Sequence, residues 1–243
     1  MKHWMTPQTL TERLQRVCGA RLQSVMLFGS AAAGDHEGAR SDYNVLIVLD
    51  RLGLEELTVL SPLARAWVKG GNPSPLLLTK MELAKAAEVF PMEIADMKEH
   101  HLLLAGEDVL SRLPVHAPNL RIQLEHELKG KLLQLRARYL LVQGRPRDVT
   151  ELMVRSLSTF LILCRGALRL YQPMVPGKKL EALAALANHV PVRPQVFETI
   201  AQLKTKRRVP GVVPEQLFAE YLQAIKAVVD AVDARLHPDR PPA

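Results

Sequence analysis

Gly29 and Ser30 are the first residues whose types and position suggest phosphate chemistry. They directly follow the apolar run 22–28, which we expect to be a buried strand. A glycine after a strand lets the backbone approach a phosphate closely. A serine at this point can open a short helix and offer both its N–H and its hydroxyl to phosphate oxygens. The pair therefore predicts a site for a phosphate-bearing ligand at the end of the strand.

Asp42 and Asn44 add metal-binding oxygens after eleven intervening residues, at the start of a second apolar run, 44–49. Because they are two apart on an expected strand, both side chains project from the same face. Two carboxylates in such positions would hold Mg²⁺ ions, which clamp the attacking and leaving oxygens in phosphoryl transfer. Asn44 offers a carbonyl oxygen but lacks the charge that balances two Mg²⁺ ions. The pair therefore predicts a catalytic metal site that is weaker than one with two aspartates.

This succession of segments resembles the nucleotidyltransferase superfamily, which includes DNA polymerase beta, aminoglycoside adenylyltransferases and minimal nucleotidyltransferases. In that family a Gly-Ser pair is followed, after a loop of about this length, by Asp-x-Asp at the start of an apolar strand; here the second motif is Asp-x-Asn. The resemblance covers about residues 20–110. It implies that Gly29 and Ser30 bind a nucleotide, that ATP or another nucleoside triphosphate is the substrate, and that Mg²⁺ is the cofactor.

The third carboxylate of this family commonly lies on a later strand. The corresponding expected strand here, 75–78, contains no acidic residue. Glu93 and Asp96 are the nearest substitutes along the chain, and Glu93 is the candidate catalytic base. In the superfamily a helical domain often follows the nucleotidyltransferase domain and shapes the acceptor site. The resemblance therefore implies an acceptor of the nucleotidyl group, either a small molecule or a protein.

Each of these residues also has a purely structural interpretation. Gly29 and Ser30 can form a strand-to-helix turn with a capping serine, and Asp42 can cap a turn. Asn44 can be an inert residue at the strand end, and Glu93 a solvated helix residue. Asn44 and the missing third carboxylate motivate an alternative function, in which a catalytically degenerate fold acts as a nucleotide- or RNA-binding or interaction module.

The first 113 residues alternate expected strands with expected helices, which indicates a small sheet with flanking helices. Strands are expected at 22–28, 44–49 and 75–78, and helices from a capping box at Thr9 and Glu12, over 54–68, and from a capping box at Thr79 and Glu82. The segment 101–105 fits either a fourth strand or a helix end. By the resemblance, residues 1–113 form a nucleotidyltransferase-like domain with a mixed sheet.

After Leu113 the pattern changes to helices. Pro114 and Pro118 mark a linker, and apolar residues then recur three and four apart. Helices are expected at about 119–142, 147–170, 178–188, 194–206 and 214–236. Such a succession predicts an all-α helical bundle over residues 114–243. The fold class expected for the whole chain is therefore α+β, with two domains.

The net charge of +7 over 243 residues is unevenly divided. Residues 1–113 carry 12 Lys and Arg against 14 Asp and Glu, whereas residues 114–243 carry 20 against 11, a net charge of +9. A basic half allows contact with nucleic acid. The basic cluster at 204–208 allows that contact, but the default interpretation is a solvated helix end whose dipole favours cations. A basic wall beside a nucleotide explains the charge as well as a nucleic-acid surface does, with Lys129 and Arg155 as examples of residues that offset phosphate charge.

Composition excludes several protein classes. Hydrophobic residues at 48% and charged residues at 23% exclude wholesale disorder, and 5% aromatic residues argue against a β-sandwich or barrel. Cys18 and Cys164 are too few for a disulfide framework or a four-cysteine zinc site, and we expect both in the core. No secretory signal or membrane-spanning run is visible. We therefore expect a cytoplasmic protein with no membrane partner.

Overall fold

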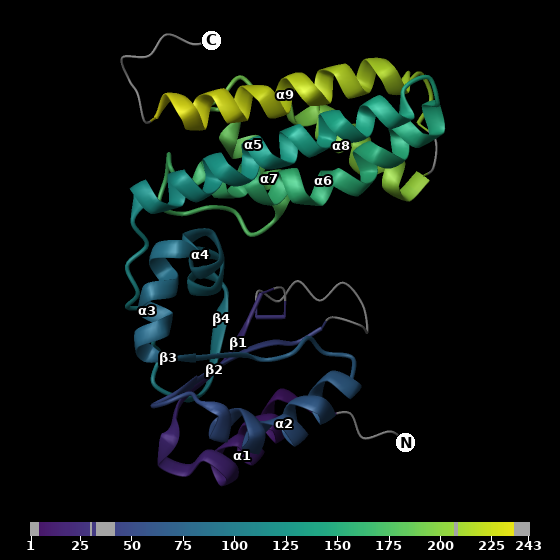
Figure 1. The fold of residues 1–243 in the computed structure, drawn as a ribbon. Coiled ribbons are helices and arrows are strands. Elements are labelled where there is room, and N and C mark those ends of the chain that lie inside the picture. The colour runs from purple at the N-terminus through teal and green to yellow at the C-terminus, as the bar shows by residue number, and fades with distance from the viewer. Residues whose placement is uncertain (1–4, 30, 33–41, 207–208, 236–243) are drawn as a thin grey trace. The chain divides into compact units, whose positions relative to one another are not determined.

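The computed structural model describes residues 5–29, 31–32, 42–206 and 209–235, so Ser30 lies outside the described residues. The chain forms two compact units, Met1–His116 and Ala117–Ala243 (Figure 1). The first unit contains the sheet, and the described part of the second contains no strand.

A mixed sheet, four-stranded within the described residues, forms the centre of the first unit. Its strands are β1 (Leu22–Phe28), β2 (Asn44–Leu49), β3 (Leu76–Thr79) and β4 (His101–Gly106), in the spatial order β3-β2-β1-β4. β1 runs antiparallel to both β2 and β4, and β2 runs parallel to β3. The two apolar runs that flank the phosphate-type motif are strands with the predicted bounds, and the ambiguous segment 101–105 is a strand.

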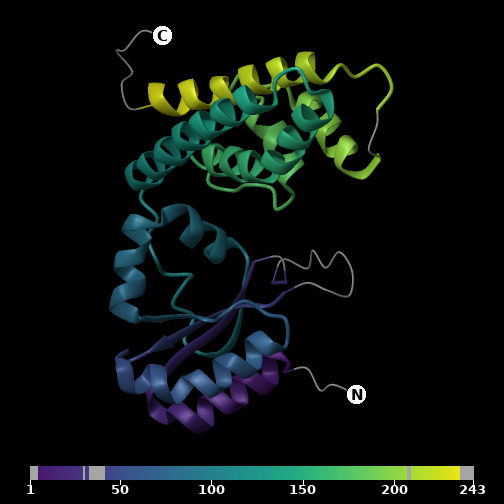
Figure 2. The same cartoon turned by 45° about the vertical axis from the view of Figure 1, so that its right-hand side comes forward.

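Helices cover both faces of the sheet (Figures 1 and 2). α1 (Pro7–Cys18), which continues into the short 3-10 helix η1 (Gly19–Arg21), packs with α2 (Leu54–Lys69) on one face, and α3 (Lys80–Val89) packs with α4 (Pro91–Glu99) on the other. Successive side chains of β2 alternate between the two cores: Val45 and Ile47 join the α1–α2 core, and Leu46 and Val48 join the α3–α4 core. Each such buried side chain contributes about 1.5–3 kcal/mol, so β2 is anchored from both sides.

The first helix begins earlier than the predicted capping box at Thr9. Thr6 is the N-cap, because its side-chain oxygen accepts a hydrogen bond from the Thr9 N–H at 3.1 Å. A proline follows it at the start of the helix, where a missing N–H costs nothing. The predicted capping box of α3 is present: the Thr79 side chain accepts from the Glu82 N–H at 3.1 Å, and the Glu82 carboxylate accepts from the Thr79 N–H at 2.8 Å.

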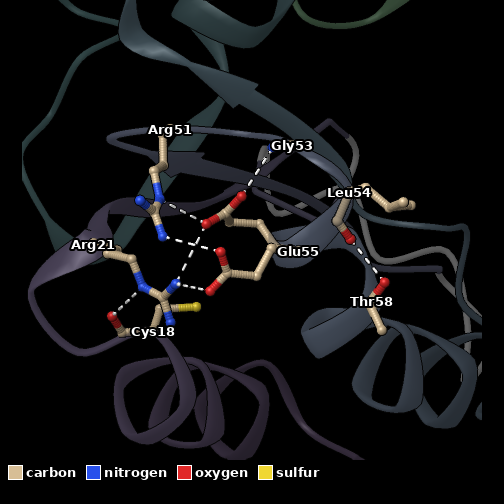
Figure 3. A network of polar contacts seen from close by, with 8 residues as sticks. Cys18, Arg21, Arg51, Gly53, Leu54, Glu55 and Thr58 are labelled. Atoms are coloured by element: carbon tan, nitrogen blue, oxygen red, sulfur yellow. Dashed lines mark hydrogen bonds and ion pairs between the residues drawn. The ribbon is translucent and has the colours of Figure 1, made fainter.

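An ion-pair network lies at the end of the sheet where β1 begins and β2 ends (Figure 3). Glu56, only 7% exposed, accepts hydrogen bonds from Arg51 at 2.8 Å, from Arg21 at 3.3 Å and from the Gly53 N–H at 3.0 Å. Burial by itself would raise the pKa of Glu56, but the hydrogen bonds from Gly53 and Arg51 hold it below its usual value. The network thus ties the first turn of α2 to the sheet.

The described part of the second unit consists of packed helices. They are α5 (Ala117–Val142), α6 (Pro146–Leu168), α7 (Lys179–Leu186), α8 (Pro194–Lys206) and α9 (Pro214–Ala234). α6 lies at the centre and packs against each of the others. The buried Tyr221 of α9 meets the rings of Phe160 and Phe197 edge-on. The predicted C-terminal helical region is therefore confirmed, and among the described helices we find none long and apolar enough to cross a membrane.

Candidate functional site

The strand register brings the two motif segments to the same end of the sheet. Phe28, the last residue of β1, pairs with Asn44 on β2 and with His101 on β4. Gly29 follows directly on β1, and Asp42 lies two residues ahead of Asn44. Residues far apart in the sequence therefore meet where β1 ends and β2 and β4 begin, as the strand assignment from the sequence implies. We call this end of the strands the sheet edge.

Gly29 has a conformation and an environment that a larger residue would disturb. Its φ of +80° lies in the left-handed region that favours glycine. A Cβ atom here would lie 3.3 Å from Nδ2 of Asn44, so the missing side chain makes room for the asparagine amide. The Gly29 N–H donates to the His100 carbonyl at 3.1 Å, and the Gly29 carbonyl accepts from the Ala32 N–H at 3.0 Å. Gly29 thus provides close approach and spare volume rather than a free N–H donor.

Asp42 and Asn44 differ in their surroundings. Asp42 is exposed, whereas Asn44 is half-buried beside Gly29. On β2 the side chain of Asn44 projects from the same face as Leu46 and Val48, which is the face that α3 and α4 cover. The exposed carboxylate is open to solvent and to ligands, and the amide is held next to the glycine.

Asn72 fixes this segment, a role that the sequence did not reveal. Its Oδ1 accepts a hydrogen bond from the Tyr43 N–H at 3.1 Å, and its Nδ2 donates to the Trp67 carbonyl at 3.4 Å. The loop after α2 therefore holds the backbone between Asp42 and Asn44. In the sequence Asn72 stands in a Gly-Gly-Asn-Pro segment that signals only a helix end, so its distant partner at Tyr43 could not be inferred.

His101 anchors the neighbouring strand at the same sheet edge. Its Nδ1 lies 3.1 Å from the carbonyl oxygens of both Met97 and Lys98, and its Nε2 lies 3.1 Å from Oδ1 of Asp108. Hydrogen bonds from the hydroxyl and N–H of Ser111, with a further one from His101, lower the pKa of Asp108 to about 2. Both ring nitrogens of His101 are engaged within the protein, which indicates a structural role for this residue.

Glu93, the candidate base, lies in the first turn of α4 with an exposed side chain. The next residue, Ile94, packs with Leu46 and Val48 in the α3–α4 core. Asn44 projects from this same face of the sheet, so Glu93 belongs to the helical layer on the Asn44 side. Its role as a base stays a prediction.

The donor set at the sheet edge fits one Mg²⁺ better than two. Asp42 supplies a carboxylate and Asn44 an amide oxygen, and within the described ranges no group of three or more His, Cys, Asp or Glu side chains is arranged to hold a metal. Mg²⁺ is usually bound through one or two carboxylates, with water and substrate phosphates as its other ligands. These residues therefore suit a single Mg²⁺ that arrives with a nucleotide.

The two basic residues that the sequence suggested for phosphate contact have different surroundings. Lys129 contacts Glu125 at 2.5 Å and Asp233 at 3.0 Å, and these hydrogen bonds raise its pKa. Arg155 lines a groove between α5 and α6 and forms an ion pair with Glu151. Lys129 is thus part of an exposed ion-pair network with Glu125 and Asp233, and Arg155 lines a groove.

Comparison with known proteins identifies the fold of the chain. No family model and no curated protein matches the sequence. Among solved structures, spectinomycin adenyltransferase AAD(9) from Enterococcus faecialis, determined with ATP and spectinomycin, matches with a TM-score of 0.53 and 13% identity over 93% of this chain and 98% of that chain. The chain has a nucleotidyltransferase fold. The predicted α+β class, a mixed sheet with flanking helices followed by a helical region, is therefore confirmed.

Proposed function

We propose that the protein is a nucleotidyltransferase that transfers AMP from ATP to a hydroxyl group of a small molecule or a protein. The observation that carries the proposal is the fold shared with an adenyltransferase over 93% of the chain, with Gly29, Asp42 and Asn44 at one end of its central strands. That adenyltransferase was determined with ATP and spectinomycin, which supports a nucleotide and a small-molecule acceptor as ligands here.

In the proposed reaction the acceptor hydroxyl oxygen forms a bond to the α-phosphorus of ATP. The bond from that phosphorus to the oxygen bridging the β-phosphate breaks, and pyrophosphate leaves. Glu93 is the proposed acceptor of the hydroxyl proton. Gly29 lets the triphosphate approach the backbone closely, and Ser30 is proposed to donate its hydroxyl to a phosphate oxygen.

Asp42 and Asn44 would hold Mg²⁺, which offsets the negative charge of the triphosphate when it is bound. Asn72 contributes indirectly, because its hydrogen bond to the Tyr43 N–H fixes the segment that carries both residues. An exposed carboxylate on a fixed backbone can reach a metal without rearrangement of the sheet. This arrangement supports Asp42 as the more important of the two ligands.

A second candidate function, nucleotide or RNA binding without turnover, is favoured by one specific observation. An amide and not a carboxylate lies against Gly29, and in the part of the chain that the structure describes no group of three or more His, Cys, Asp or Glu side chains could hold a metal. An amide lacks the charge that a two-metal site needs. In this alternative the same sheet edge binds the phosphates of a ligand and performs no transfer.

A transfer assay tests the proposal. The protein is incubated with labelled ATP, Mg²⁺ or Mn²⁺, and a panel of hydroxyl acceptors that includes spectinomycin. We expect transfer by the wild type and a loss of about a hundredfold in Asp42→Ala, because the variant would lose the Mg²⁺ that offsets charge on the reacting phosphates, and the loss of one electrostatic contact of this kind costs about 10²–10³ in rate. Asp50→Ala is the matched control, because Asp50 is also exposed but lies beyond the opposite end of β2. No transfer by the wild type, or equal transfer by Asp42→Ala, would refute the proposal.

Calorimetry of ATP binding with and without Mg²⁺ separates the two functions. Binding that needs no metal, with no turnover, supports the binding module. ATP binding with an Mg²⁺-dependent component that disappears in Asp42→Ala supports the transferase. Transfer that rises in Asn44→Asp would show that the metal site limits the activity.

A further inference from the structure

We propose that the groove between α5 and α6 is a binding site for a small, multiply charged phosphate-bearing anion. The groove has a volume of about 220 Å³ and is formed by side chains of the helical unit alone. The proposal does not depend on the nucleotidyl-transfer activity, because no residue of the sheet edge takes part in it.

Two facing stripes of residues build the groove. α5 contributes Lys131, Gln134, Leu135 and Arg138, which are spaced three, four and seven apart and so lie on one helix face. α6 contributes a second stripe with the same periodicity, which consists of Leu152, Arg155, Ser156, Thr159 and Phe160. Because the two helices pack side by side, the stripes converge on a common volume.

The residues that line the groove include cations and no carboxylate. The cations are Lys131, Arg138 and Arg155. The acidic partners of two of these cations lie outside the lining: Glu127 is 3.8 Å from Lys131, and Glu151 pairs with Arg155. For Arg138 we find no ion pair with any residue that the structure describes. Three cations without an acid among them favour an anion with more than one negative charge over a monocarboxylate.

The polar groups of the groove match phosphate chemistry. The guanidinium groups of Arg138 and Arg155 present planar donor forks that bind phosphate oxygens in pairs. Gln134 and the half-buried Thr159 add neutral donors beside them. The Ser156 hydroxyl is engaged within the protein: its Oγ donates to the Met153 carbonyl at 3.1 Å and lies 3.3 Å from the Tyr221 hydroxyl. The groove therefore offers the donors of Arg138, Arg155, Gln134 and Thr159 to a ligand.

Size limits the ligand. Pockets that enclose a drug-sized ligand usually measure about 300–1,000 Å³, so a groove of about 220 Å³ holds a phosphate or pyrophosphate group with at most part of its carrier. Leu135, Leu152 and Phe160 are almost fully buried and form an apolar floor. A second hollow shares Arg138, Leu152 and Arg155 and also includes Asp148 and Glu151, which do not line the groove itself.

Arg136 provides a matched control for Arg138. Both arginines are exposed residues of α5, and for neither do the described residues supply an ion pair, but only Arg138 lines the groove. Replacement of either by glutamine removes one positive charge from the same helix. If the anion binds in the groove, only Arg138→Gln weakens its binding. If binding reflects the overall net charge of +9 of residues 114–243, both substitutions weaken it equally.

The test is a calorimetric titration of the full-length protein with inorganic pyrophosphate in EDTA. We expect saturable binding that weakens about tenfold in Arg138→Gln, the loss of one charge-assisted contact, and less than twofold in Arg136→Gln. Binding should persist in Asp42→Ala. No saturable binding, equal weakening in both arginine variants, or loss of binding in Asp42→Ala would overturn the proposal. Single-stranded RNA is the alternative ligand. If it binds more tightly than pyrophosphate and both arginine substitutions weaken its binding equally, the proposal is overturned in favour of a nucleic-acid surface.

Discussion

The two anion sites that we propose, one in each unit, are built in different ways. In the first unit, which is nearly neutral in charge balance, backbone conformation and neutral hydrogen bonds set the geometry: Gly29 adopts φ +80°, and Asn72 holds Tyr43. In the helical unit, periodic side chains place Lys131, Arg138 and Arg155 around one groove. The comparison teaches that the net charge of +7 says little about the sheet edge, where the proposed ligand-binding features are a single exposed carboxylate and a turn.

This difference predicts that glycine-to-alanine substitutions at strained backbone positions lower the stability of the first unit by large and graded amounts. Gly106 has φ +83°, and a Cβ there would lie 2.1 Å from the Gln23 carbonyl oxygen. We expect Gly106→Ala to lower the free energy of unfolding of this unit by about 3 kcal/mol or more, through strain and overpacking together. Gly29→Ala should cost less, because its Cβ meets only the Asn44 amide. Gly71→Ala, at φ +93° in open space, should cost least, about 1 kcal/mol.

Tryptophan fluorescence is the measurement for this series. Both tryptophans, Trp4 and Trp67, belong to the first unit, so denaturant unfolding followed by their emission reports that unit. Far-UV circular dichroism is dominated by the helices of the second unit. Equal destabilisation by all three alanine substitutions would contradict the account of the backbone given above.

Asn72 offers a sharper test of the positioning in the first unit. Asn72→Ala removes the acceptor for the Tyr43 N–H, and we expect a loss of about 1 kcal/mol of stability and about fivefold weaker ATP binding. Asn72→Asp keeps an acceptor oxygen and should weaken ATP binding less than twofold. Asn188→Ala, an exposed asparagine of the helical unit, is the control. Equal ATP affinities of the alanine and aspartate variants would show that the hydrogen bond to Tyr43 does not position the site.

The smallest expected effect concerns pH. Asp108 has a pKa lowered from 3.8 to about 2, so its ionised form stabilises the folded first unit above about pH 4. That contribution is lost as the pH falls from about 4 towards 2, and Asp108→Asn should flatten the fall in tryptophan-detected stability over this window. Asp230→Asn on α9, where Asp230 pairs with Lys226 at 2.7 Å, should leave the tryptophan signal unchanged. An unaltered pH dependence in Asp108→Asn would show that Asp108 does not contribute in this way.

The fold was largely predictable because its main signals are local. The runs 22–28 and 44–49 are apolar and bounded by turn residues, so their bounds follow from sequence alone, and the helical periodicity after Leu113 is equally clear. β4 was ambiguous because it is an edge strand with Leu102 and Leu103 exposed, so it lacks an alternating pattern. Its assignment depends on pairing with β1, more than seventy residues earlier in the chain, which no local pattern reports.

The candidate site was predictable only in its motif residues. Gly29, Asp42 and Asn44 stand out by type and spacing, and the structure brings Gly29 and Asn44 into contact range. The contribution of Asn72 could not be seen, because it depends on a contact across 29 residues of chain. The groove between α5 and α6 was hidden for the same reason: Arg138 and Arg155 look like solvated helix residues until the two helices are packed together.

The most direct test of the central claim is a crystal structure of the full-length protein soaked with a non-hydrolysable ATP analogue and Mn²⁺. The account predicts an anomalous peak beside Asp42, with the triphosphate at the end of β1 next to Gly29. A metal away from Asp42, or a triphosphate bound in the α5–α6 groove with the sheet edge empty, would contradict it.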